Sequence, residues 1–172
     1  MAQKNFSLEG IKVLLVTTGY PPDFSSSGKR LHLMLTRMTT RFSDFGWRVL
    51  TMSSHNSNDR FEGIEIKRIR HIQPLGFLSK SARFNVPIDA FYGIIASIAY
   101  FMSIREKVDI VHTSGWSWNV FAASLWARIN GIPLVRELTS MRDQPMVQSK
   151  LKCLIRATLK WADLIVAISP YL

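Results

Sequence analysis

Residues 11–17 read IKVLLVT, and residues 18–28 read TGYPPDFSSSG. The first stretch is rich in β-branched and leucine side chains, which is typical of a parallel strand buried on both faces. The second is rich in turn-forming residues and predicts a loop. From Lys29 to Phe45 apolar residues recur at three- and four-residue spacings, which predicts a helix with Gly46 as its C-cap. With a short strand at 49–52, the chain opens as strand, loop, helix and strand.

The remainder of the chain continues this alternation. Residues 63–72 alternate apolar and polar side chains, which predicts a half-exposed strand, and residues 73–87 read as an irregular loop. Further helices are expected at 88–104, 120–130 and 145–162, and further strands at 108–112, 133–137 and 163–168. Such alternation implies right-handed crossovers. We therefore expect an α/β fold, a Rossmann-like parallel sheet with helices on both faces.

Length and composition fit one ordered domain, with 172 residues of which 47% are hydrophobic. The single cysteine, Cys153, excludes an internal disulfide, and its apolar neighbours predict a thiol that is at least half-buried. The amino terminus carries no secretory pattern, and the longest apolar stretch is shorter than the roughly 20 residues of a membrane-spanning helix. We expect a cytoplasmic protein, either free or peripheral on the inner face of the cell membrane.

The net charge of +10 indicates anionic partners, such as nucleic acid, acidic lipid or phosphorylated substrates, or a merely solvated basic surface. The sequence has no helix-turn-helix, zinc or RNA-recognition signature, so no nucleic-acid partner is expected. Four scattered histidines and one cysteine make no metal set. We expect neither a metal nor another cofactor.

In parallel α/β sheets ligands bind beyond the carboxyl ends of the strands, which here selects loops 18–28, 113–119 and 138–144 and the tail after Ser169. In the first loop, Ser25 to Gly28 open a helix, where backbone N–H groups favour an anion and glycine permits close approach. A serine-rich turn with an ordinary helix cap explains the same residues. The loop lacks the phosphate-loop and dinucleotide-binding patterns.

Two further residues stand near this edge. His112, expected at the end of a strand, can orient a hydroxyl or phosphate or act as an acid–base group, or it is a core histidine bonded to backbone. Glu137 can accept hydrogen bonds from sugar hydroxyls, or it pairs with Arg136 or Arg142 for structural reasons.

The expected helix at 145–162 carries Lys152, Arg156 and Lys160 at four-residue spacing beside an apolar stripe. Such a helix can lie on an anionic membrane surface, with its charges on the phosphates. It can equally pack its apolar face on the sheet and solvate its basic residues. The loop at 73–87 mixes aromatic and basic residues and is a second candidate membrane or acceptor contact.

Four segments in order resemble the amino-terminal domain of the family 4 glycosyltransferases, which adopt the GT-B fold. They are the opening IKVLLVTTGYPPDFSSSGKRLHLML, DIVHTSG at 109–115, GIPLVRELTS at 131–140 and ADLIVAISPYL at 162–172. The match spans essentially the whole chain. The resemblance implies that residues 1–172 form the acceptor-side, Rossmann-like half of a two-domain enzyme, with the carboxyl-terminal donor-binding domain absent from this chain.

The family implies retaining transfer of a sugar from a nucleotide-diphosphate sugar, usually without a metal. The expected acceptor is a cell-surface polysaccharide or a lipid-linked glycan. By position Ser27 and Gly28 match the paired glycines near the donor phosphates, and His112 and Ser114 match the family's two histidines. Glu137 and Ser140 line the next loop.

Serine at 27 and at 114 departs from the pattern, since serine restricts φ at the first position and cannot take a proton at the second. The basic and carboxylate pairs that hold the donor belong to the second domain, supplied in cis or in trans. We therefore expect negligible transfer by the 172-residue chain alone. The alternative is a non-catalytic module that docks onto a separate donor-domain subunit or an anionic membrane.

Overall fold

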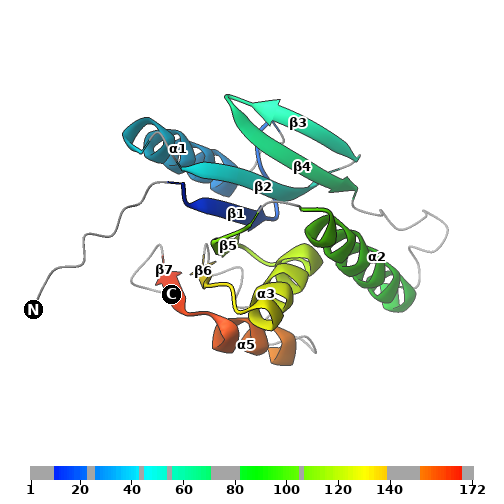
Figure 1. The fold of residues 1–172 in the computed structure, drawn as a ribbon. Helices are drawn as coiled ribbons and strands as arrows, with labels where there is room; N and C mark the ends of the chain where they lie inside the picture. The colour runs from blue at the N-terminus through cyan, green and yellow to red at the C-terminus, as the bar shows by residue number, and fades with distance from the viewer. Residues whose placement is uncertain are drawn as a thin grey trace, which may run out of the picture.

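The computed structural model describes residues 10–22, 26–42, 45–53, 56–70, 82–104, 107–138 and 152–167, without the side chains of 26–27, 82–90 and 152. Helices and strands alternate along the chain (Figure 1). In order they are β1 (Lys12–Thr17), α1 (Ser26–Arg41), β2 (Gly46–Ser53), β3 (Ser57–Phe61), β4 (Ile64–Arg70), α2 (Ala82–Ser103), β5 (Ile110–Ser114), α3 (Trp118–Asn130), β6 (Leu134–Leu138), α5 (Lys152–Trp161) and β7 (Leu164–Ala167).

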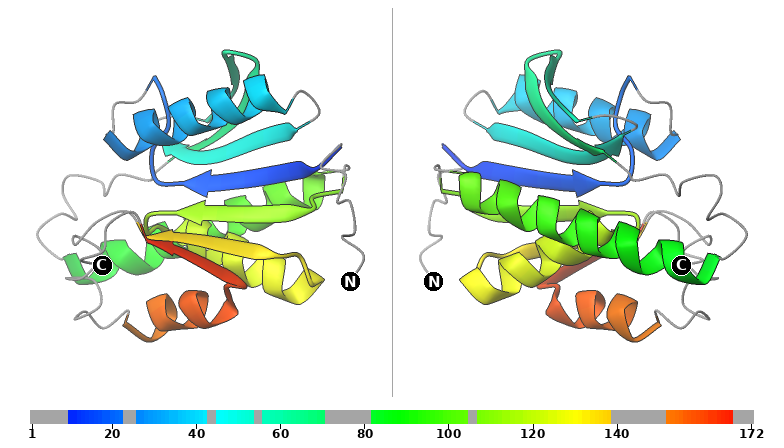
Figure 2. Two further views of the ribbon diagram at one scale, coloured as in Figure 1. Left: turned by 90° about the vertical axis from the view of Figure 1, so that its left-hand side faces the viewer. Right: turned by 90° about the vertical axis from the view of Figure 1, so that its right-hand side faces the viewer.

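Within these described residues, seven strands form one sheet in the order β3-β4-β2-β1-β5-β6-β7. Every neighbouring pair is parallel except β3 and β4, which form an antiparallel hairpin. The carboxyl ends of the parallel strands therefore meet at one edge, where the arrowheads lie together in Figure 2. The predicted α/β class is confirmed.

Helices cover both faces of the sheet (Figure 2). On one face Leu31 and Leu35 of α1 pack with Leu15 and Val49. The opposite face buries a larger cluster, in which α2 and α3 contribute Phe101, Val120 and Ala123 and α5 adds Trp161. Alternate residues of β1 thus serve opposite cores, which explains why its sequence is apolar throughout.

Several boundaries differ from the predictions. Helix α1 begins at Ser26 and ends at Arg41, so Gly46 is not its C-cap. The Gly46 N–H instead donates to the carbonyl of Ile11, 3.0 Å away, at the entry to β2. Strand β5 begins two residues later than predicted, and the carboxylate of Asp109, just before it, accepts the N–H of Lys12. His112 therefore lies in the middle of β5, and Ser114 ends it.

Four further predictions concern a strand, two helix ends and the cysteine. The polar strand β3 was not predicted; a two-residue turn joins it to β4, with φ of 48° at Glu62 and 82° at Gly63, as a type I′ hairpin requires. Helix α2 starts at Ala82, inside the predicted loop. Gly131 ends α3 in the left-handed conformation, as predicted. Cys153 is exposed, so its predicted burial is wrong.

Candidate functional site

The strand register aligns four polar residues on the neighbouring strands β2, β1, β5 and β6, near the carboxyl ends of these strands. Thr17 is paired with Thr51 of β2 on one side and with Ser114 of β5 on the other, and Ser114 is paired with Glu137 of β6. All four are at most 3% exposed. Since alternate residues share a face, this polar row lies on the α1 side, two residues beyond the apolar row of Leu15. It stands at the edge where ligands of parallel sheets bind.

Glu137 is the charged member of the polar row. Arg30 of α1 donates through Nη2 to its Oε1 at 2.5 Å, and His112 Nε2 lies 3.6 Å from its Oε2. Burial alone would raise the pKa of Glu137, but the neighbouring His112 and the hydrogen-bonded Arg30 outweigh it and hold that pKa below the ordinary value. The carboxylate is therefore ionised at neutral pH, and Arg30 fixes its orientation.

The proposed pairing of Glu137 with Arg136 is wrong, because adjacent strand residues point to opposite faces. Arg142 lies outside the described residues, as does Ser140. The structural partner of Glu137 is instead Arg30, on an element distant in sequence.

Several buried polar atoms in or beside the row make no hydrogen bond within the described part of the chain. They are Thr51 Oγ1, Ser114 Oγ, His112 Nε2 and Glu137 Oε2. Buried polar atoms are nearly always paired with protein, water or ligand. Buried atoms of Trp47, Ser53, Ser97 and Asn119 likewise make no hydrogen bond within the described residues, so what distinguishes the row is its place at the carboxyl edge of the sheet.

The loops after β1 and β5 meet at this edge. Gly115 follows Ser114 with φ of 74°, and a Cβ built there would lie 3.0 Å from Thr18 Oγ1. Both the backbone conformation and the close approach require glycine. Two of the loops selected from sequence are thus in direct contact.

The amino-terminal end of α1 lies at the same edge (Figure 2). Ser27 and Gly28 belong to the first turn of the helix rather than to the preceding loop, and Gly28 is buried. Backbone N–H groups at a helix amino terminus favour anions. The arrangement suits a phosphate beside the polar row, although Ser27's side chain is not described.

The first loop is held to the sheet by Arg68 of β4, which is 1% exposed. Its guanidinium donates to the carbonyls of Tyr20 and Pro21 at 3.2 and 2.5 Å and to Asp59 at 2.6 Å. The bonds to Tyr20 and Pro21 hold the first loop on the sheet, and the bond to Asp59 of β3 orients the guanidinium.

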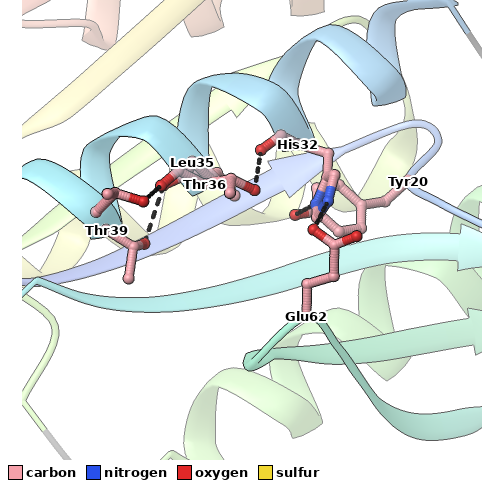
Figure 3. A network of polar contacts seen from close by, with 7 residues as sticks. Tyr20, His32, Leu35, Thr36, Thr39 and Glu62 are labelled. Atoms are coloured by element: carbon pink, nitrogen blue, oxygen red, sulfur yellow. Dashed lines mark hydrogen bonds and ion pairs between the residues drawn. The ribbon is translucent and has the colours of Figure 1, made fainter.

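A second polar chain adjoins this anchor (Figure 3). His32 of α1 bridges the Tyr20 hydroxyl at 2.9 Å and the Glu62 carboxylate at 2.8 Å. Burial first, and then the charge of Glu62, raise the pKa of Tyr20, while Arg68 opposes them. The network ties the first loop to the β3–β4 turn.

The three basic residues proposed to contact a membrane belong to α5. Arg156 and Lys160 are exposed, whereas Lys152 is the first residue of the helix and its side chain is not described. Ile155 and Thr158 face the protein. None of the described helices is long and apolar enough to cross a membrane. Among the described residues, no three potential ligands cluster as a metal site would need.

Sequence reasoning missed Arg30, Thr17, Thr51 and Arg68. Thr17 could have been found as the polar end of a buried strand. The other three carry no local signal, because their roles depend on which strands and helices pack together.

No family model matches the chain, and no curated protein matches it. Solved structures do match. A putative UDP-N-acetylglucosamine 2-epimerase from Listeria monocytogenes is 13% identical with a TM-score of 0.62, over 93% of this chain and 40% of that one. A sucrose-phosphate synthase from Thermosynechococcus elongatus is 13% identical with a TM-score of 0.57, over 93% and 43%.

The catalytic domain of starch synthase IV from Arabidopsis thaliana, bound to ADP and acarbose, is 12% identical with a TM-score of 0.51, over 78% of this chain and 35% of that one. The chain thus spans less than half the length of the structures it resembles. These neighbours are GT-B glycosyltransferase and epimerase folds. At such identities they establish architecture alone: the chain has the Rossmann-like α/β fold of GT-B proteins.

Proposed function

We propose that this chain is the amino-terminal, acceptor-side domain of a retaining glycosyltransferase. It acts with a carboxyl-terminal GT-B domain, in cis or in trans, which holds most of a nucleotide-diphosphate sugar. The acceptor is a cell-surface polysaccharide or a lipid-linked glycan, met on the cytoplasmic side of the membrane. The observation that carries the proposal is the buried polar row beside the amino terminus of α1.

The row offers the chemistry that a glycan needs. Glu137 Oε2 and Ser114 Oγ are buried and make no hydrogen bond within the described residues, so an acceptor hydroxyl that enters the row can donate to them. The fixed carboxylate then disfavours analogues that lack the hydroxyl. Arg30 holds Glu137 through its other oxygen, so the acceptor meets an oriented group. His112, whose Nε2 lies 3.6 Å from Glu137 Oε2, is the candidate acid–base group of this site.

The chain supplies only some of the groups that would bind the nucleotide-sugar donor. The first turn of α1, with Ser27 and Gly28, faces the position of the diphosphate, and positioned cations for the departing phosphate come from the second domain. We therefore propose that transfer requires that domain, and that the 172-residue chain alone binds acceptor without turnover. No metal or cofactor takes part beyond the nucleotide sugar.

The test is calorimetric binding of oligosaccharides and nucleotide sugars to the chain and to Glu137→Gln. We expect the substitution to weaken glycan binding about tenfold or more, since a hydrogen bond to a charged group contributes roughly 1.5–3 kcal/mol. The matched control is Glu65→Gln, an exposed carboxylate in an ion pair with Arg48.

Equal binding by Glu137→Gln and the parent chain would remove the polar row from acceptor recognition. Tight binding of UDP-N-acetylglucosamine with no response to any glycan would instead favour an epimerase.

A further inference from the structure

Two open cavities share lining residues at the amino-terminal edge of the sheet, opposite the edge where the arrowheads meet in Figure 2. The first measures about 290 Å³ and is lined by Lys12 and Gly46, which begin β1 and β2. The second measures about 550 Å³ and lies between the β3–β4 hairpin and the carboxyl-terminal end of α2. Arg48, Arg60 and Glu65 line both, so the two cavities form one continuous depression, the amino-edge groove.

Basic side chains line the amino-edge groove along its length. They come from four strands and from the segment before β5: Lys12 of β1, Arg48 of β2, Arg60 of β3, Lys67 of β4 and Lys107. A cleft lined by charges of one sign attracts ligands of the opposite sign. The groove thus gives a place to part of the net charge of +10, which indicates an anionic partner.

Fewer carboxylates face these cations. Glu65 lies 3.0 Å from Arg48 and 3.6 Å from Arg60, so it is shared between two guanidinium groups. Asp59 is bound to the buried Arg68 at 2.6 Å. The third carboxylate, that of Asp109, lies 3.0 Å from Lys107. Among the described residues, basic charge around the groove therefore exceeds acidic charge.

Neutral polar and aromatic side chains stand between the cations. Asn58 of β3 and Ser103 of α2 supply an amide and a hydroxyl group, and Tyr100 lines the same part of the groove. Phe45 and Trp47 line the other part, with their rings stacked at 5.6 Å. Because these two rings pack on each other, they do not offer separate platforms on which successive nucleic-acid bases would stack.

We propose that the amino-edge groove binds an acidic oligosaccharide. The guanidinium groups of Arg48 and Arg60 pair with carboxylate groups such as those of uronic acids, whose planar shape they match. The hydroxyl groups of the sugar bond to neutral side chains such as Asn58, and the apolar ring faces pack on Tyr100. The groove shares no residue with the polar row and lies at the opposite edge of the sheet. The proposal therefore stands or fails separately from the proposed acceptor site.

The arrangement of the cations favours a chain over a single small anion. Lys107 and Lys12 lie at one cavity, Lys67 lies at the other, and Arg48 and Arg60 are common to both. A lone phosphate would contact only a few of these groups, because they do not converge on one point. A chain of acidic units meets them in succession.

The experiment is titration calorimetry of the chain with hexagalacturonate, with maltohexaose as the uncharged control. We expect hexagalacturonate to bind at least tenfold more tightly than maltohexaose, and its binding to weaken as salt is added. Arg60→Gln/Lys67→Gln should weaken it about tenfold or more, because charge-assisted hydrogen bonds are lost. The matched control is Arg156→Gln/Lys160→Gln on α5, which removes the same charge and should bind as the parent does. No binding by the parent chain, or an equal loss in the α5 variant, would overturn the proposal.

Two single substitutions locate the binding. Glu65→Gln removes the carboxylate shared by Arg48 and Arg60, so it should tighten the binding of hexagalacturonate and leave that of neutral oligosaccharides unchanged. Glu137→Gln, in the polar row, should leave hexagalacturonate binding unchanged. Weaker binding by Glu137→Gln together with unchanged binding by Glu65→Gln would move the acidic sugar to the polar row and overturn the proposal.

Other polyanions test the chemical class of the ligand. Oligothymidylate and oligoglutamate of the same charge should bind more weakly than hexagalacturonate. Tighter binding of either would overturn the proposal, and the groove would then be a site for nucleic acid or for an acidic protein segment.

A label in the groove covers the case of a poorly folded charge variant. In a Cys153→Ser background, an environment-sensitive dye on Asn58→Cys should change its emission when hexagalacturonate is added. The same dye on Ile129→Cys, at an exposed position of α3, should not respond. A response at position 129 without one at position 58 would place the ligand elsewhere and overturn the proposal.

Discussion

Replacement of Arg30 by glutamine tests whether the buried carboxylate of Glu137 depends on its partner on α1. Removing one member of a buried ion pair costs about 3–5 kcal/mol, because the other charge is left without compensation. The Glu137 side chain is 4% exposed, but that of Arg30 is 38% exposed and partly screened. We therefore expect Arg30→Gln to lower the free energy of unfolding by about 1–2 kcal/mol at neutral pH.

The pH dependence follows from the lowered pKa of Glu137, whose ordinary value is 4.5. A carboxyl group with a lowered folded-state pKa contributes stability above its ordinary value and loses it as the pH falls through the lowered value. The parent chain thus loses this contribution below about pH 4.5. Without Arg30, burial destabilises the ionised carboxylate of Glu137, and protonation at acid pH removes that unfavourable charge from the variant. The two unfolding curves should converge toward acid pH.

The assay is urea denaturation from pH 7 down to about pH 3 for the parent chain, Arg30→Gln, Glu137→Gln and the double variant. The coupling free energy from this cycle should be about 1–2 kcal/mol at pH 7. The control is Arg60→Gln, an exposed guanidinium 3.6 Å from Glu65, for which about 0.5 kcal/mol or less is expected. A destabilisation by Arg30→Gln that does not vary with pH would refute the reasoning.

Three further predictions concern the loops beside the site. Gly115→Ala should lower the free energy of unfolding by about 3 kcal/mol. The control Gly131→Ala should lower it by about 1 kcal/mol, because Gly131 also has a positive φ but has nothing within 4 Å of the added Cβ. Similar losses for the two variants would contradict this. Arg68→Met should cost about 3 kcal/mol in thermal or urea unfolding, since three hydrogen bonds of a buried side chain disappear. A loss below about 1 kcal/mol would deny that Arg68 anchors the first loop. Burial raises the pKa of Tyr20 above its ordinary 10, so the stabilising contribution of Tyr20 is complete below pH 10 and is lost as the pH rises further. Absorbance titrations of the folded parent chain and of Tyr20→Phe should therefore coincide to about pH 11. A phenolate signal from Tyr20 near pH 10 would contradict this.

The sheet was predictable because its signals are local. The apolar run of β1 and the glycine that ends α3 each follow from a few neighbouring residues, and both predictions hold. Strand β3 escaped because its sequence, SNDRF, is polar, and its pairing depends on the turn at Glu62 and Gly63 and on the neighbouring strand.

The site was predictable only in part. Glu137 was selected because it stands at the carboxyl end of a predicted strand, and Ser114 because it matches the second histidine position of the family that the chain resembles. Their relation depends on the register of three strands, and a two-residue error at β5 placed His112 at the strand end instead of Ser114. Arg30 was missed because 107 residues separate it from Glu137, and only the packing of α1 on the sheet brings them together.

The central claim is that this domain supplies the acceptor side of a two-domain sugar transfer. It is tested most directly by following labelled sugar from a nucleotide-sugar donor into glycan. The comparison is the chain alone against the chain together with a carboxyl-terminal GT-B domain, joined in cis or supplied in trans. We predict transfer only when both domains are present, and a loss of about tenfold or more with Glu137→Gln. Turnover by the 172-residue chain alone, or two-domain transfer that Glu137→Gln leaves unchanged, would contradict the account.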